Sequence, residues 1–179
     1  MPSAGIGSKV IELGGGAAAD SAQVYWFDAN DTATAATPIT HVGTATDTYL
    51  TNDALGTDTA AYNPNSKAVL WNTATNSFDF TSLKIGDIVN LRIDLEISNA
   101  AAQEVDLKML LGEGSATEFE KSIVHAYYKT ANTGTPVTGI YQFYIGNNNT
   151  KNNPGRIRFA SLDAATIKVI GWFYVIIEV

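Results

Sequence analysis

The chain has 179 residues, no cysteine and a formal net charge of −7. Its length suits one domain with a hydrophobic core of its own. The acidic balance argues against nucleic-acid binding, which requires a basic surface, and the lack of cysteine excludes disulfides and thiolate metal sites. The first residues also lack the basic region and the continuous apolar core of a signal peptide.

Residues 1–20 are predicted to form an extended arm. Gly and Ala are dense there, with the run GGGAAA at residues 14–19, and the apolar side chains form one short group without a helical or strand period. An arm of this kind is expected to be held by a partner. Its candidate contact residues are Lys9, Val10, Ile11 and Leu13.

Residues 21–76 are predicted to be rich in loops, with brief strands at AQVYWF (22–27) and KAVLW (67–71). Between these strands, long stretches of Thr, Ala, Asp and Asn are interrupted by Pro and Gly. Such stretches favour turns and make long helices unfavourable.

From residue 77 onward the hydrophobic pattern has the period of two that strands show. DIVNLRIDLEIS (87–98) alternates apolar residues with charged or amide residues, and QEVDLKMLLG (103–112) repeats the scheme. The apolar positions are Val89, Leu91, Ile93, Leu95 and Ile97 in the first strand and Val105, Leu107, Met109 and Leu111 in the second. The short link SNAAAQ between them predicts that the two strands are adjacent and antiparallel.

Four further strands are expected, each separated from the next by a short turn-forming segment, at residues 122–129, 137–146, 155–162 and 166–179. No amphipathic helix is predicted between them. Strands at this spacing are typical of an antiparallel β-sandwich. We therefore expect residues 21–179 to form one sandwich domain, loop-rich over 21–76 and regular over 77–179.

The last strand, TIKVIGWFYVIIEV, is apolar on both faces. It is too short for a membrane-spanning helix, which needs about 20 apolar residues, and it is rich in β-branched and aromatic types. A sandwich requires only one apolar face per strand, so we expect the second face to pack against another subunit. The two arginines of the preceding strand are expected to pair with acidic residues of that neighbour. The candidate interface residues are Ile140, Tyr144, Arg156, Arg158, Ile170, Trp172, Tyr174 and Ile176.

The sequence offers little catalytic chemistry. His41 and His125 are the only histidines, and neither lies in a local catalytic signature. Carboxylates two residues apart, such as Glu118 and Glu120, alternate with apolar residues as they do on an ordinary solvated strand face. We therefore expect no enzyme activity and no cofactor, with a sandwich-fold hydrolase acting through carboxylates as the alternative.

Two polar segments have the chemistry to bind a ligand. DANDT, which begins at Asp28, places oxygen ligands close together, but Ala33 and Ile39 occupy the positions where a calcium loop needs glycine and glutamate, so we expect no metal. The Asn-rich loop of residues 147–153 follows a tyrosine-bearing strand, a combination that suits sugars as well as a solvated hairpin tip. The candidate glycan contacts are Tyr141, Asn147, Asn148 and Asn149.

The whole pattern resembles the trimeric jelly-roll proteins of tailed bacteriophage virions. The resemblance depends on the Gly/Ala-rich arm, the Thr/Asp-rich loops, the central FDFTSLKIGDIVNLRIDLEI (78–97) and the closing IKVIGWFYVIIEV (167–179). It covers residues 78–179 well, whereas the first third is similar only in its general composition. It implies an all-β, antiparallel jelly-roll-like β-sandwich with an extended N-terminal arm, with the last strand near the threefold centre of a homotrimer.

Proteins of that class either cement a capsid, by bridging major capsid subunits from outside, or form the knob of a head or tail fibre. The chain has no triple-helical, coiled-coil or repetitive shaft. The resemblance therefore favours a non-enzymatic decoration or cement protein on the outer capsid surface. The implied partners are a homotrimer and the major capsid protein, with neither nucleic acid nor a membrane. The alternative is a receptor-binding knob that contacts a host-surface glycan.

Overall fold

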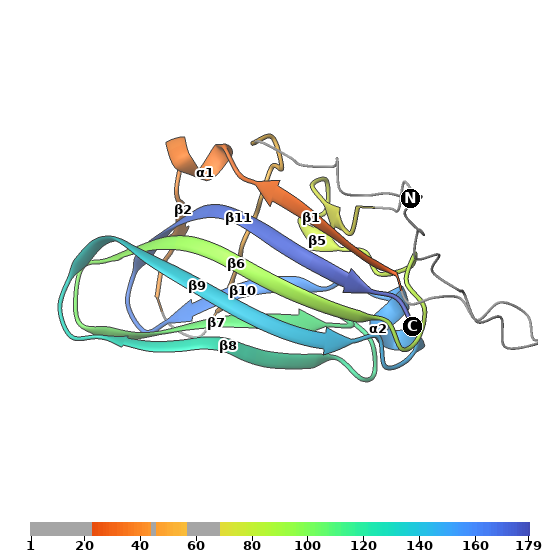
Figure 1. The fold of residues 1–179 in the computed structure, drawn as a ribbon. Helices are drawn as coiled ribbons and strands as arrows, with labels where there is room; N and C mark the ends of the chain where they lie inside the picture. The colour runs from red at the N-terminus through yellow and green to blue at the C-terminus, as the bar shows by residue number, and fades with distance from the viewer. Residues whose placement is uncertain (1–22, 44–45, 57–68) are drawn as a thin grey trace, which may run out of the picture.

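The computed structural model describes residues 23–43, 46–56 and 69–179, and it consists of two antiparallel sheets packed face to face (Figure 1). Sheet A contains, in spatial order, β1 (Val24–Asn30), β11 (Ala165–Ile177), β6 (Ile88–Asn99) and β9 (Asn132–Tyr144), and β2 (Ile39–His41) pairs with the start of β11. Sheet B contains β3 (Thr48–Tyr49), β10 (Arg156–Ser161), β7 (Gln103–Leu111) and β8 (Phe119–Tyr128).

Short elements complete the described fold. They are the hairpin of β4 (Trp71–Asn72) and β5 (Ser77–Phe78) and the helices α1 (Ala33–Ala36) and α2 (Asn148–Asn152). Of the strand predicted at KAVLW, Lys67 and Ala68 lie outside the described residues, and Trp71 begins β4. The amide of Leu70 donates to the Tyr174 hydroxyl instead of to a neighbouring strand. No helix in the described part of the chain has the length and apolar character needed to cross a membrane.

The strand order is that of a jelly roll. β1, β11, β6 and β9 form one sheet, and β3, β10, β7 and β8 form the other. From β6 onward, consecutive strands lie in opposite sheets, except for the β7–β8 hairpin. Eight antiparallel strands wound into two sheets in this way define the jelly-roll sandwich. The predicted fold class is therefore confirmed, whereas the arm predicted at residues 1–20 lies outside the described residues.

The core lies between the sheets and contains the strand faces that the period of two predicted. All five predicted apolar residues of β6 and all four of β7 are buried. Aromatic side chains fill the space between them, and the rings of Phe27 and Tyr174 stack with their centroids 5.1 Å apart. Burial on one face of each strand thus follows directly from the alternation of apolar and polar residues.

The connection between β6 and β7 corrects one prediction. The two strands are not adjacent, since β6 pairs with β11 and β9 while β7 pairs with β10 and β8. Buried amides hold this connection: the Asp163 amide donates to Gln103 Oε1 at 3.0 Å, and Asn99 Nδ2 donates to the Thr130 carbonyl at 3.4 Å. A link this short can join two adjacent strands of one sheet or two strands in opposite sheets. The pairing of β6 and β7 with strands distant in sequence decides between these two arrangements.

A bulge in β11 corrects a second prediction. The register with β6 shifts between Val169 and Gly171, so the side chains that follow change face. Glycine permits this close approach to β1, because a Cβ at Gly171 would lie 2.6 Å from Asn30 Oδ1. Strict alternation along the last strand is therefore wrong. The residues that face the core after the bulge are Trp172, Tyr174 and Ile176.

Candidate functional site

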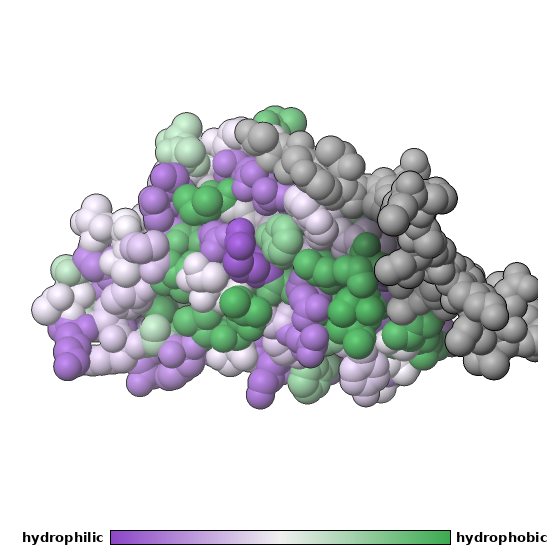
Figure 2. Space-filling model, in the orientation of Figure 1, coloured by the Kyte–Doolittle hydropathy of each residue, from purple (hydrophilic) through white to green (hydrophobic). Residues whose placement is uncertain are grey.

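The outer face of sheet A carries more apolar side chains than a sandwich needs for its own core. Tyr144, Ile88 and Ile177 are cross-strand neighbours on β9, β6 and β11. Further along, Ile140 on β9 is 72% exposed and Phe173 on β11 is partly exposed. Figure 2 shows hydrophobic surface over the strands of sheet A, interrupted by hydrophilic side chains. We call this surface the sheet A patch and define it as Ile88, Ile140, Tyr144, Phe173, Val175 and Ile177.

The predicted interface residues of β9 and β11 divide into two groups. The accessible group consists of Ile140, Tyr144 and Ile170. The buried group consists of Trp172, Tyr174 and Ile176, each 0% exposed. The prediction of an interface role is wrong for the buried group, because the bulge turns these side chains into the core. Phe173 and Val175 take the outward positions of the strand instead.

Arg156 and Arg158 lie on the outer face of sheet B, where their charges are met within the chain. Arg156 Nε lies 2.5 Å from Glu113, and Arg158 Nη1 lies 3.1 Å from Glu120. Both guanidinium groups lie about 5 Å from the centre of the Tyr49 ring, a cation–π arrangement. The predicted pairing with acidic residues of a neighbouring subunit would therefore compete with these internal partners.

Glu113 gives this ion-pair network a dependence on pH. Burial opposes ionisation of its carboxyl, but hydrogen bonds from Tyr49 and Arg156 outweigh burial and hold the pKa of Glu113 below its usual value of 4.5. Because the folded-state pKa is lowered, the stabilisation is present above the unfolded pKa and is lost as the pH falls through the folded value.

Replacement of Glu113 by glutamine should therefore lower the free energy of unfolding at neutral pH by about 1 kcal/mol, the upper end for ion pairs with solvent access. The difference from the unsubstituted chain should shrink at acidic pH, as the pH falls through the lowered pKa of Glu113 and its carboxyl becomes protonated. Urea unfolding at neutral and at acidic pH measures this. Glu104→Gln, at an exposed position of β7, is the control. A difference between the two proteins that does not change with pH would contradict the assigned role of the Glu113 charge.

A groove lies where the end of β9 and the start of α2 meet the start of β8. It has a volume of about 380 Å³, is open to solvent, and is lined on the β9 side by Tyr141 and Tyr144 and on the β8 side by Phe119. Asn147 lines it from the N-cap of α2, where its side chain accepts a hydrogen bond from the Thr150 amide at 2.9 Å. We call this the aromatic groove.

The aromatic groove brings together part of the predicted glycan site. Tyr141 and Asn147 line it, as expected. Asn149 instead donates from Nδ2 to Thr117 Oγ1 at 2.8 Å and ties α2 to the β7–β8 loop, and Asn148 does not line the groove. The predicted hairpin tip is one helical turn, capped by Asn147. Sequence reasoning missed Phe119, although a lone aromatic residue between Glu118 and Glu120 is a usable signal of an exposed ring.

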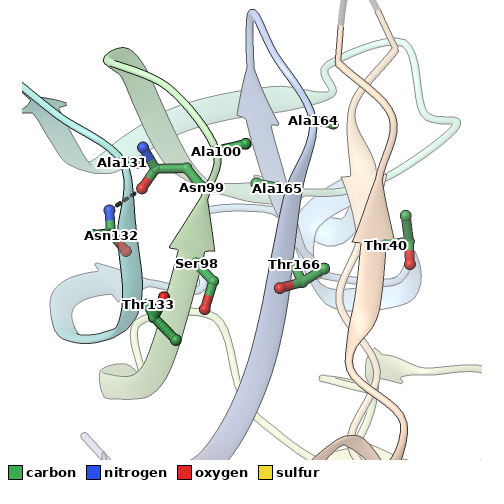
Figure 3. Close-up of a pocket in the computed structure, with 10 residues that line it drawn as sticks. All are labelled: Thr40, Ser98, Asn99, Ala100, Ala131, Asn132, Thr133, Ala164, Ala165 and Thr166. Atoms are coloured by element: carbon green, nitrogen blue, oxygen red, sulfur yellow. Dashed lines mark hydrogen bonds between the residues drawn. The ribbon is translucent and has the colours of Figure 1, made fainter.

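A second hollow lies at the opposite end of β6 and β9. Hydroxyl groups of Thr40, Thr166 and Ser98 line it from three neighbouring strands, and Figure 3 shows the side chains of Asn99 and Asn132 in contact beside them. The remaining residues around it are Ala100, Ala131, Thr133, Ala164 and Ala165. It has room for a ligand, about 610 Å³, but its walls carry neither a charged group nor an aromatic ring.

Asp31 and His41, which were considered for metal binding and catalysis, have structural partners. Asp31 accepts hydrogen bonds from the amides of Thr34 and Asp53, and so it organises the turn that holds the DANDT segment. His41 is buried, with its Nδ1 2.8 Å from Thr48 Oγ1. His125 is exposed on β8 opposite Asp106. Among the described residues, no group of three or more His, Cys, Asp or Glu side chains is placed to hold a metal ion.

The four arm residues Lys9, Val10, Ile11 and Leu13 lie outside the described residues. Their role in binding a capsid stays a prediction.

No protein-family model matches the chain, and no curated protein matches it. Solved structures with similar folds include Eiger TNF from S. frugiperda, with a TM-score of 0.47 and 7% identity over 87% of this chain and 92% of that chain. They also include infectious bursal disease virus of the Gt strain, with a TM-score of 0.44 and 12% identity over 99% of this chain.

The T13 viral particle of infectious bursal disease virus gives a TM-score of 0.37 and 10% identity over 99% of this chain. The chain spans 38% of the Gt-strain chain and 40% of the T13 chain. At these identities and TM-scores the likeness concerns only the fold, and the jelly-roll assignment follows from the strand order of the chain itself.

Proposed function

We propose that this chain is a structural protein of a virion. In this proposal it assembles as a homotrimer on the outer surface of a bacteriophage capsid and cements the shell by bridging major capsid subunits. Residues 78–179 resemble trimeric jelly-roll virion proteins, and the strand order agrees with the fold that this resemblance implies. The role is non-enzymatic.

The observation that carries the proposal is the sheet A patch. Exposed apolar side chains gather on this sheet face, with Asn90, Arg92 and Gln142 between them. Apolar surfaces that are bordered by polar residues mark contacts between proteins. Here the patch spans β9, β6 and β11, beyond the core that the sandwich has already filled. Copies of the chain that cover the patch would form the trimer, and further contacts of an anchored trimer would act at high effective concentration.

The partners of the carboxylates support a structural role rather than hydrolysis. Glycoside hydrolysis needs a carboxylic acid whose pKa is raised so that it can donate a proton. The pKa of Glu113 is lowered instead, Glu120 pairs with Lys108 at 3.3 Å, and Glu118 accepts a hydrogen bond from the Gly114 amide. Glu113 therefore stabilises the fold in its ionised form, and Glu118 and Glu120 have partners within the chain.

Capsid binding tests the proposal. The full chain and a variant that lacks residues 1–20 are mixed with capsids assembled from the cognate major capsid protein and then sedimented. We expect the full chain to sediment with the capsids, and the shortened variant to keep its fold and native mass but stay in the supernatant. Equal binding by both proteins would remove the role of the arm, and no binding by the full chain would overturn the decoration role.

A further inference from the structure

We propose that the aromatic groove binds a neutral sugar ring, as part of a surface glycan. This binding activity is additional to the proposed assembly, and the groove is formed within one chain. Tyr144 belongs to both the groove and the sheet A patch, so Phe119 and Tyr141, which lie outside the patch, supply the rings for the sugar in the assembled trimer. It is built by Thr117, Phe119, Tyr141, Tyr144, Asn147 and Thr150, from the β7–β8 loop, β8, β9 and α2.

The aromatic side chains supply flat apolar surface that is accessible to a ligand. Phe119 is 52% exposed and Tyr144 is 66% exposed. Tyr141 is partly buried, and its ring stacks on Phe143 with the centroids 5.7 Å apart, which fixes its orientation. The faces of aromatic rings are electron-rich, so they attract the slightly positive C–H bonds on the face of a pyranose.

The polar side chains are oriented by the fold and retain groups for a ligand. Asn147 Oδ1 accepts the capping hydrogen bond from Thr150, whereas its Nδ2 has no hydrogen-bond partner among the described residues. Gln142 likewise uses one of its two polar atoms within the chain. Its Nε2 donates to Asn90 Oδ1 at 2.6 Å, and its Oε1 accepts no hydrogen bond from the described residues. One donor and one acceptor beside the aromatic rings match the hydroxyl groups of a sugar, which both donate and accept.

The charge and size of the groove define the class of sugar. None of the residues that line the groove is charged, so an acidic sugar would lose hydration without gaining a cationic partner. Its volume of about 380 Å³ lies in the lower part of the range for small-molecule clefts, which suits a mono- or disaccharide. The hollow of Figure 3 lacks an aromatic ring on which a sugar could stack, and it is therefore the less suitable site.

Binding is tested on the full chain with a panel of neutral methyl glycosides of glucose, galactose, mannose and N-acetylglucosamine, together with N-acetylneuraminic acid. Saturation-transfer NMR identifies the binders, and titration gives their dissociation constants. We expect at least one neutral glycoside to bind and the acidic sugar to be silent. Silence of the whole neutral panel, or preference for the acidic sugar, would overturn the proposal.

Two substitutions locate the site. Asn147→Asp keeps the oxygen that caps α2 but removes the Nδ2 donor, and Phe119→Ala removes one exposed ring. Each should weaken binding about tenfold, the size expected for one lost hydrogen bond or stacking contact. Asn148→Asp makes the same change of charge at the adjacent position outside the groove and should bind as the unsubstituted chain does. Unchanged binding by a folded Asn147→Asp variant would place the sugar elsewhere.

Discussion

Replacement of Trp172 by alanine is expected to lower the free energy of unfolding by about 3–5 kcal/mol, the usual cost of removing a large aromatic side chain from a core. Trp172 is fully buried, and its ring lies 5.6 Å from that of Trp71 in an edge-to-face arrangement. Domains of this size are stable by only about 5–15 kcal/mol, so the substitution should remove a large part of the total. Urea unfolding followed by circular dichroism measures the change.

The neighbouring residue provides the control for Trp172. Phe173 follows it on β11 but faces outward, so Phe173→Ala should cost clearly less stability than Trp172→Ala. If Trp172→Ala does not fold, Trp172→Phe serves instead; it keeps part of the buried volume and loses no hydrogen bond, since Trp172 Nε1 has no partner in the described residues. An unchanged unfolding midpoint together with a changed native mass would place Trp172 in a subunit interface after all.

Replacement of Ile140 by lysine is expected to dissociate the proposed trimer. Ile140 is 72% exposed on the sheet A patch, so a lysine there is well solvated in the monomer and should not disturb the fold. In an assembled interface the same ammonium group would be buried without a partner, which costs about 3–5 kcal/mol. Light scattering at two protein concentrations should give three chains for the unsubstituted protein and one chain for Ile140→Lys.

Leu162→Lys is the matched control for Ile140→Lys. Leu162 is 68% exposed in the link between β10 and β11, outside the sheet A patch, so the same change of charge should leave the trimer intact. Equal dissociation of both variants would indicate a general effect of charge. A stable monomer for the unsubstituted chain would contradict the proposed assembly and would leave the sugar site, which lies within one chain, to be tested separately.

The period of two in the sequence was sufficient to predict which residues of β6 and β7 are buried. Val89 and Met109 are buried as expected, because alternate side chains of any strand point to opposite faces whatever its neighbours are. The same reasoning failed on β11 beyond Val169. A bulge depends on how a strand matches its neighbours, so the alternation of apolar residues in one segment does not reveal it.

The candidate sites also combine residues that are close in sequence with residues that only the fold brings together. Tyr141 and Asn147 lie six residues apart on a strand and the turn that follows it, so the sequence could predict them as one glycan site. Phe119 reaches the groove only because β8 lies beside β9 across the edge of the sandwich. Likewise, Glu113 meets Tyr49 and Arg156 only after β3, β10 and β7 pair in sheet B.

The sequence by itself therefore determined the all-β class, the buried faces of the regular strands and the polar and aromatic chemistry of the Asn-rich loop. These properties depend on the order of residues within short segments. The tertiary structure alone decided that β6 and β7 lie in opposite sheets, that Trp172, Tyr174 and Ile176 belong to the core, and that the arginines of β10 are paired within the chain. Those outcomes depend on contacts between segments far apart in sequence, whose free energies are fixed only when both sheets are assembled.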